Sequence, residues 1–171
     1  MENILIRNYQ DKDLSNYVKF FNYIASRLDI STTSEKEVKI HFQDPRRNPY
    51  KNMFVVYRES KFIGYIYLYL DSITETKRVE SGIVIHPNYR RKGIGTKLLK
   101  TLLNRCNELN ISIIDVFTKK DTEAAREFAK KNKFKIERYF YEMRNENLKN
   151  IEKVKIPKGI TFDKFNSKNT H

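Results

Sequence analysis

Apolar and polar positions along the chain follow two different spacings. Over 14–28 and 94–109 apolar side chains recur every three or four residues, as on one face of a helix. Shorter runs that are apolar throughout or alternate with polar residues predict strands. The expected strands are 4–6 with Tyr9, 53–58, 62–70, 79–85, 112–117 and 134–143. The expected helices are 14–28, a short one capped by Ser34, 94–109 and one that follows Asp121.

The predicted order of elements is β-α-α-β-β-β-α-β-α-β. Runs 53–58 and 62–70 are separated by only three residues, which is typical of a hairpin, and 79–85 continues the meander. A chain of 171 residues is long enough to bury a core of its own. We therefore expect the α/β (α+β) class, with a mixed, mostly antiparallel central sheet flanked by helices on both faces.

A basic loop and two glycines separate strand 79–85 from the helix that follows it. Gly93 and Gly95 stand where the helix starts, so a ligand can approach the backbone there without a side chain in the way. The first turn of a helix has unpaired N–H groups and a partial positive charge. The basic side chains around this turn are Arg90, Arg91, Lys92 and Lys97. The pattern predicts a site for an anion such as phosphate or pyrophosphate.

Two common phosphate motifs do not describe this turn. A Walker loop, GxxxxGK[ST], is absent, and GxGxxG is incomplete because Leu98 takes its third position. Asp115 has roughly the spacing of a dinucleotide-binding carboxylate, but it lies in the middle of a predicted strand. The run 85–95, IHPNYRRKGIG, instead resembles the acyl-coenzyme A signature of the GNAT superfamily of N-acetyltransferases, and the resemblance extends more loosely over 3–144.

The resemblance implies transfer of an acetyl group from acetyl-coenzyme A to an amine acceptor, a small molecule or a protein, by direct attack in a ternary complex. It implies a pantetheine arm along the end of strand 79–85 and a pyrophosphate at the glycine turn. The residues expected to bind the coenzyme are Ile83, Val84, Ile85, Arg90, Arg91, Lys92, Gly93, Ile94, Gly95 and Thr96.

In this family the first two helices and the loop after them shape the acceptor site, which here corresponds to 14–52. The candidate residues in that segment are Tyr17, Phe20, Phe21, Tyr50 and the loop 45–47.

The catalytic groups depart from the family pattern. Glu80 is the only carboxylate on strand 79–85, but alternation places it on the face opposite Val79 and Ser81, where related enzymes tend to carry their base. Glu80 would then act through water. The family's acid is a tyrosine that ends an N-x-x-A-x-x-F-Y run, and Ala129 occupies that position here, which leaves Tyr139 or Tyr141 as substitutes. The alternative function is a non-catalytic acyl-coenzyme A-binding or regulatory module of a tandem GNAT protein.

The amino-acid composition limits which binding partners and which cellular compartment we expect for this protein. The net charge of +13, from 34 Lys and Arg against 21 Asp and Glu, favours anionic ligands. The basic residues are scattered, so nucleic acid is not an expected partner. The longest apolar run, 62–70, is too short to span a bilayer and no signal peptide is evident, which predicts a cytoplasmic protein, monomeric or homodimeric. Cys106 is the one cysteine and lies on an apolar helix stripe, so no metal site is expected.

The end of the chain repeats a feature of its beginning. Segments 160–169 and 4–13 both have apolar residues at their first, third and sixth positions and Lys at the ninth. We expect an acetyltransferase domain over 1–148, and a linker with a strand-like extension over 149–171. Tandem GNAT proteins of the mycothiol synthase-like kind begin a second domain in this way, so the extension is predicted to start a second repeat. A strand over 160–165 would pair with an exposed sheet edge or be disordered.

Overall fold

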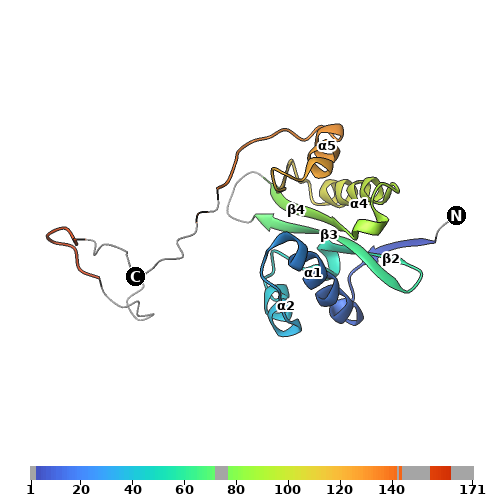
Figure 1. Cartoon of the computed structure of the whole chain (residues 1–171), viewed down its shortest axis with the longest axis horizontal. Coiled ribbons are helices and arrows are strands. Elements are labelled where there is room, and N and C mark those ends of the chain that lie inside the picture. Colours follow the sequence, from blue (N-terminus) through green and yellow to red (C-terminus); the bar gives the residue numbers. More distant parts are fainter. Residues whose placement is uncertain (1–2, 72–76, 142, 144–154, 163–171) are drawn as a thin grey trace. The chain divides into compact units, whose positions relative to one another are not determined.

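The computed structural model describes residues 3–71, 77–141, 143 and 155–162 (Figure 1). The chain divides into two compact units, Met1–Arg126 and Glu127–His171. The sheet and the helices on its two faces belong to the first unit. The predicted domain boundary at residue 148 lies outside the described residues and stays a prediction. In the part of the chain that is described, no helix is both long and apolar enough to cross a membrane.

Five strands form one sheet in chain order, β1-β2-β3-β4-β5. Neighbouring strands are antiparallel from β1 to β4, and β5 runs parallel to β4. The predicted mixed, mostly antiparallel sheet is therefore confirmed. The strands are β1 Ile4–Asn8, β2 Met53–Arg58, β3 Lys61–Asp71, β4 Arg78–Ile85 and β5 Ile113–Val116.

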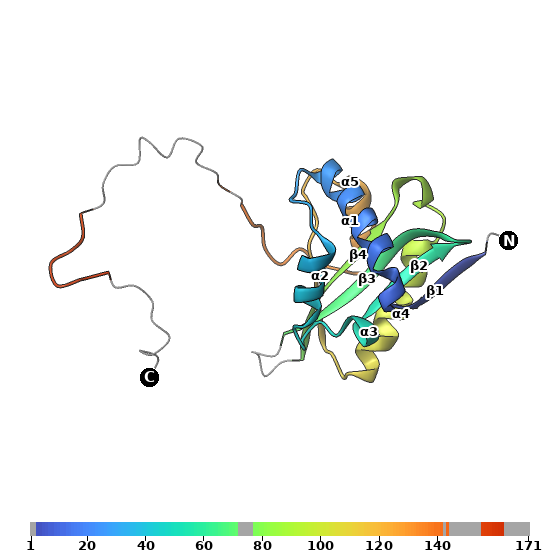
Figure 2. The ribbon, with the colours of Figure 1, turned by 90° about the horizontal axis from the view of Figure 1, so that it is seen from below.

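Helices cover both faces of this sheet, as the sequence predicts. Helices α1 and α2 lie on one face and α4 on the other (Figure 1), and Figure 2 looks onto the face that α1 and α2 cover. The predicted capping box of α2 is formed, because Ser34 and Glu37 exchange hydrogen bonds. The helices are α1 Leu14–Leu28, α2 Glu35–Phe42, α3 Pro49–Asn52, α4 Ile94–Glu108 and α5 Glu123–Lys131, with 3-10 turns at Asp11–Asp13 and Pro87–Tyr89.

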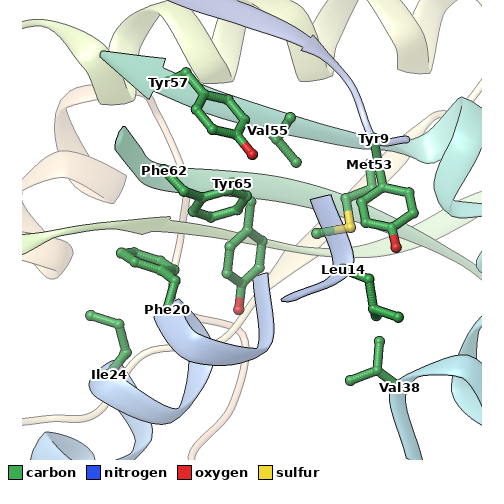
Figure 3. Packing of buried hydrophobic residues seen from close by; sticks show 10 residues of the cluster. All are labelled: Tyr9, Leu14, Phe20, Ile24, Val38, Met53, Val55, Tyr57, Phe62 and Tyr65. Carbon is green, nitrogen blue, oxygen red and sulfur yellow. The ribbon is translucent and has the colours of Figure 1, made fainter. Parts of the chain in front are cut away.

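The core has one layer on each side of the sheet. Under α1 and α2, aromatic rings from helix and sheet interlock: the ring centroids of Phe20 and Phe62 are 5.3 Å apart, and those of Tyr17 and Tyr65 are 5.1 Å apart. Figure 3 shows the ten buried residues of this layer: Tyr9, Leu14, Phe20, Ile24, Val38, Met53, Val55, Tyr57, Phe62 and Tyr65. Ile66 and Leu68 alternate with Tyr65 along β3 and therefore face α4, where Leu98 and Leu102 are fully buried.

Two predicted strands are not found. Residues 134–141 and 143 form no strand, so that prediction is wrong for the described part of 134–143. Residues 160–162 form none either, and 163–165 lie outside the described residues. A strand needs a neighbour to bond its backbone groups, and an alternating sequence specifies faces without providing that neighbour. The side chains of Ile136, Phe140 and Phe162 are accordingly exposed.

Candidate functional site

Strand β4 has different neighbours along its two edges. It pairs with β3 from Arg78 to Ile85, which is its full length. It pairs with β5 only from Arg78 to Ser81, because β5 ends at Val116. Within 77–141, where every residue is described, no strand lies opposite the second half of β4 on this edge. The predicted coenzyme-binding residues Ile83, Val84 and Ile85 belong to that half.

The backbone direction of this half of β4 follows from its pairing with β3. The N–H of His86 donates to the carbonyl of Ile63 at 2.9 Å, and hydrogen-bonding residues alternate along an antiparallel edge. Val84 therefore directs its N–H and C=O toward β3. Ile83 and Ile85 direct theirs away from β3, toward the edge that β5 leaves uncovered. Of the three predicted strand residues, these two can offer backbone groups to a ligand.

The turn after β4 is held by local hydrogen bonds. Nδ1 of His86 accepts from the N–H of Asn88 at 3.2 Å, and Nε of Arg90 donates to the carbonyl of Ile85 at 3.0 Å. Arg91 and Gly93 both have a positive φ, 60° and 76°. Left-handed residues in such a turn direct N–H groups into a shared concave surface that suits an anion. Arg90 therefore stabilises the turn through this hydrogen bond and also places a positive charge beside it.

The start of α4 fits a phosphate group. Gly93 is the N-cap residue, no side chain caps the helix, and no acidic residue stands in its first turn. The first N–H groups of the helix have no partner within it. Gly93, Thr96 and the basic residues 90–92 are exposed, while Ile94 is buried and anchors the turn to the core. The predicted anion site is thus assembled by one contiguous segment.

Sequence reasoning missed two cations beside this turn. Arg58 and Lys61 lie 5.5 Å and 5.7 Å from the ring centroid of Tyr89, and the predicted Lys92 lies 5.8 Å from it. The first two come from the β2–β3 hairpin, where the sequence indicates only a tight turn. Since the two segments are distant in the chain, only the fold adds their charge to the anion site.

Glu80 lies on the α1 and α2 face of β4. The Tyr67 hydroxyl donates to the Glu80 carboxylate at 3.3 Å, and the Tyr67 ring lies so close to Gly82 that a Cβ there would be 2.8 Å from it. Burial, followed by the negative charge of Glu80, raises the pKa of Tyr67 to about 12. The opposite face of β4 carries Val79 and Ser81, which are both buried. Glu80 therefore faces the helices predicted to shape the acceptor site.

The loop before α3 is attached to the strand beside Glu80. Arg46 forms a two-pronged ion pair with Asp44, and the Tyr69 hydroxyl donates to the same carboxylate at 3.0 Å. The N–H of Leu70 donates to the carbonyl of Arg46 at 3.0 Å. Since Tyr69 is the residue of β3 directly opposite Glu80, this loop is held next to the candidate base.

The remaining predicted residues have other surroundings. Asp115, the alternative dinucleotide carboxylate, is ion-paired with Arg78 of the neighbouring strand. Ala129, Tyr139 and Tyr141 belong to the second unit, and both tyrosines are exposed. The role of Tyr139 or Tyr141 as an acid stays a prediction. Cys106 is buried in the α4 stripe as predicted, and burial raises the pKa of its thiol to about 11.

The fold is shared with solved acetyltransferase structures at low sequence identity. A predicted acetyltransferase with acetyl-CoA from Clostridium acetobutylicum has a TM-score of 0.67 at 20% identity, with 83% of this chain and 96% of that chain covered. A ribosomal-protein-alanine N-acetyltransferase from Brucella melitensis biovar Abortus 2308 has 0.66 at 16%, covering 83% and 99%. An aminoglycoside acetyltransferase from an uncultured soil metagenomic sample, in complex with sisomicin, has 0.65 at 17%, covering 82% and 97%.

A family model also matches the sequence directly. The model describes the acetyltransferase (GNAT) family and aligns with residues 18–134, which include most of α1, the hairpin, β4, the glycine turn and α4. Because the matched residues are more than half of the 171, the chain belongs to the acetyltransferase (GNAT) family.

Proposed function

We propose that this protein transfers an acetyl group from acetyl-coenzyme A to a primary amine, by direct attack in a ternary complex. One observation carries the proposal. Strand β5 ends opposite Ser81, so no strand of the described chain pairs with the outward backbone groups of Ile83 and Ile85, of which the Ile85 carbonyl accepts from Arg90, and the glycine turn that begins α4 follows β4 in the chain. An extended, amide-containing arm and an attached pyrophosphate need this combination of a free strand edge and a helix N-terminus.

The coenzyme would be held by 83–85 and 90–96. The N–H groups at the start of α4 would bind the pyrophosphate, and the cations of the turn would neutralise its charge. The backbone of Ile83 and Ile85 would pair with the amides of the pantetheine arm. Acetyl-coenzyme A itself supplies the activated acetyl group as a thioester. An N–H of the same strand would donate to the carbonyl oxygen as negative charge develops there.

Glu80 would prepare the amine. An alkyl amine has a pKa near ~10.4 and must lose a proton before it can attack. The Glu80 carboxylate lies on the face of the sheet that α1 and α2 cover, which we call the acceptor face. The Tyr67 hydroxyl orients it, so it can accept that proton through a water molecule. The similarity to an aminoglycoside acetyltransferase and to a ribosomal-protein-alanine N-acetyltransferase supports amine chemistry, with a small-molecule or a protein acceptor.

The departing thiolate lacks the tyrosine that the family usually provides. Ala129 takes its position in the run 122–129, and Tyr139 or Tyr141 would supply the proton instead. Replacing each tyrosine by Phe should lower kcat for the one that acts. If neither change alters kcat and Ala129→Tyr raises it, the protein works without a dedicated acid.

Calorimetry with acetyl-coenzyme A, together with release of free thiol across a broad amine panel, tests the proposal. Binding with acetyl transfer to at least one amine is expected. Binding without transfer to any amine would favour the rival function, a non-catalytic acyl-coenzyme A-binding module. No binding at all would contradict both.

A further inference from the structure

Two neighbouring arginines in the loop before α3 have different partners. The guanidinium carbons of Arg46 and Arg47 both lie over the Tyr69 ring, at 4.8 Å and 4.6 Å from its centroid. Arg46 is neutralised by Asp44. Arg47 is half-buried, and among the described residues no carboxylate forms an ion pair or hydrogen bond with it. A charge removed partly from water without a counterion is costly unless a ligand provides one.

Arg47 is connected to the candidate base through the pairing of β3 with β4. Its ring partner, Tyr69, is directly opposite Glu80 in the β3–β4 register, and directly opposite residues have Cβ atoms about 5 Å apart. The positive charge of Arg47 opposes the rise in the pKa of Tyr67 that burial and Glu80 cause, so it reaches the hydroxyl that orients Glu80. A cation and an anion thus lie on the same face of the sheet, each in contact with a tyrosine of β3.

The coenzyme phosphates are not the natural counterion for Arg47. The anion-binding turn follows the far end of β4, and Ile85 is five positions beyond Glu80, which is about 16 Å along the strand. The Arg47 loop is instead fastened beside Glu80 by Asp44, Tyr69 and the N–H of Leu70. Its free charge is therefore available to the acceptor.

We propose that Arg47 is a specificity-determining residue that binds an acidic group of the acceptor, so that the preferred acceptors are small amines carrying a carboxylate or phosphate. The proposal rests on the acetyltransferase function given above. In this arrangement the acceptor lies across Tyr69 and Tyr67, with its amine toward Glu80 and its acidic group on the guanidinium. Arg47 takes no part in the proton transfer and acts through binding alone.

Paired acceptors that differ only in the acidic group test this directly. Suitable pairs are phenylalanine with phenethylamine, lysine with 1,5-diaminopentane, and 2-aminoethyl phosphate with ethylamine. We expect wild type to acetylate the acid-bearing member of at least one pair with the higher kcat/KM. Arg47→Gln should lower that value by about ten- to a hundredfold, because it removes hydrogen bonds between charged groups, and should leave the other member unchanged. Arg47→Lys should keep part of the preference.

Lys100→Gln is the control for net charge, since it also removes one positive charge but from an exposed position of α4, on the other face of the sheet. It should leave the ratio between the two members unchanged. Acetylation of amines without preference for the acidic member, or a preference that survives Arg47→Gln, would overturn this inference and leave the acetyltransferase function standing. If wild type acetylates no amine of any kind, the proposed function fails and this inference fails with it.

Discussion

The proposed coenzyme turn and the proposed acceptor face are built in different ways. The turn, residues 86–96, uses backbone N–H groups, two glycines and local hydrogen bonds within one contiguous segment. The acceptor face combines side chains of β3, β4 and the loop 43–48, which are distant in sequence and meet only through strand pairing. A backbone site tolerates changes of side chain but not of shape, whereas a side-chain site depends on individual charges. The two regions should therefore fail separately when mutated.

The largest effect is expected at the turn. Gly95→Glu adds a side chain and a negative charge to the first turn of α4, where the pyrophosphate would bind. Losing two hydrogen bonds from backbone N–H groups to the charged pyrophosphate should weaken acetyl-coenzyme A binding by about a thousandfold, measured by calorimetry. Asn104→Glu introduces the same charge at an exposed position farther along α4 and should leave affinity unchanged. Equal loss in both variants would mean that net charge, not the turn, governs binding.

The next effect should be confined to the acceptor face. Glu80→Gln keeps a hydrogen-bond acceptor for the Tyr67 hydroxyl and removes the proton acceptor. We expect kcat to fall by about a hundredfold, with the dissociation constant for acetyl-coenzyme A unchanged. Steady-state rates with one amine and calorimetry on the same variant separate the two quantities. A variant with full kcat would assign the base elsewhere.

The sequence predicts the turn better than the acceptor face, because the turn is one contiguous segment and the acceptor face combines segments that are distant in the chain. The glycine turn is visible in Arg90–Gly95 because its parts are adjacent, and the strand and helix around it are confirmed. For the acceptor site, the family resemblance indicates only the segment 14–52, with Tyr17, Phe20, Phe21, Tyr50 and the loop 45–47 as candidates. No spacing in the sequence indicates that Arg47 and Tyr69 meet, or that Tyr69 stands opposite Glu80, since both depend on the register of β3 with β4. The predicted strand over 134–143 is wrong in its described part for a related reason. Strand pairing requires a neighbouring strand, and an alternating pattern does not specify which segment that neighbour is.

A smaller effect should come from Gly82, which has no side chain and lies under Tyr67. In Gly82→Ala the new methyl group would be 2.8 Å from the present position of the Tyr67 ring, so the ring must move and release its hydroxyl from Glu80. We expect kcat/KM for the amine to fall by about tenfold, since the base remains but loses its orientation. Coenzyme affinity should change little. A larger loss of coenzyme affinity than of acceptor kcat/KM would show that the two regions are coupled through β4.

We expect the smallest effect from Tyr69→Phe. This variant tests how the loop 43–48 is attached to the sheet without changing any charge. The variant keeps the ring on which Arg46 and Arg47 stack but removes the hydrogen bond to Asp44. Because the Arg46–Asp44 ion pair remains and Asp44 is partly exposed to water, we expect only a two- to threefold rise in the acceptor KM, less than the full contribution of a hydrogen bond to a charged group.

The pH dependence gives an independent check. Hydrogen bonds from Arg46, followed by those from its backbone N–H and from Tyr69, hold the pKa of Asp44 well below its usual range despite partial desolvation. A carboxylate with a lowered folded-state pKa stabilises the fold above its ordinary pKa, and that contribution is lost as the pH falls. The loop should therefore stay attached from pH 7 down to the ordinary aspartate pKa of about 4, in wild type and variant alike. The KM of an acceptor whose own acidic group does not titrate in that range, such as an amino acid, should stay constant. An acceptor KM that rises steeply above that pH would show that Asp44 does not hold the loop and that the acceptor face is organised by another contact.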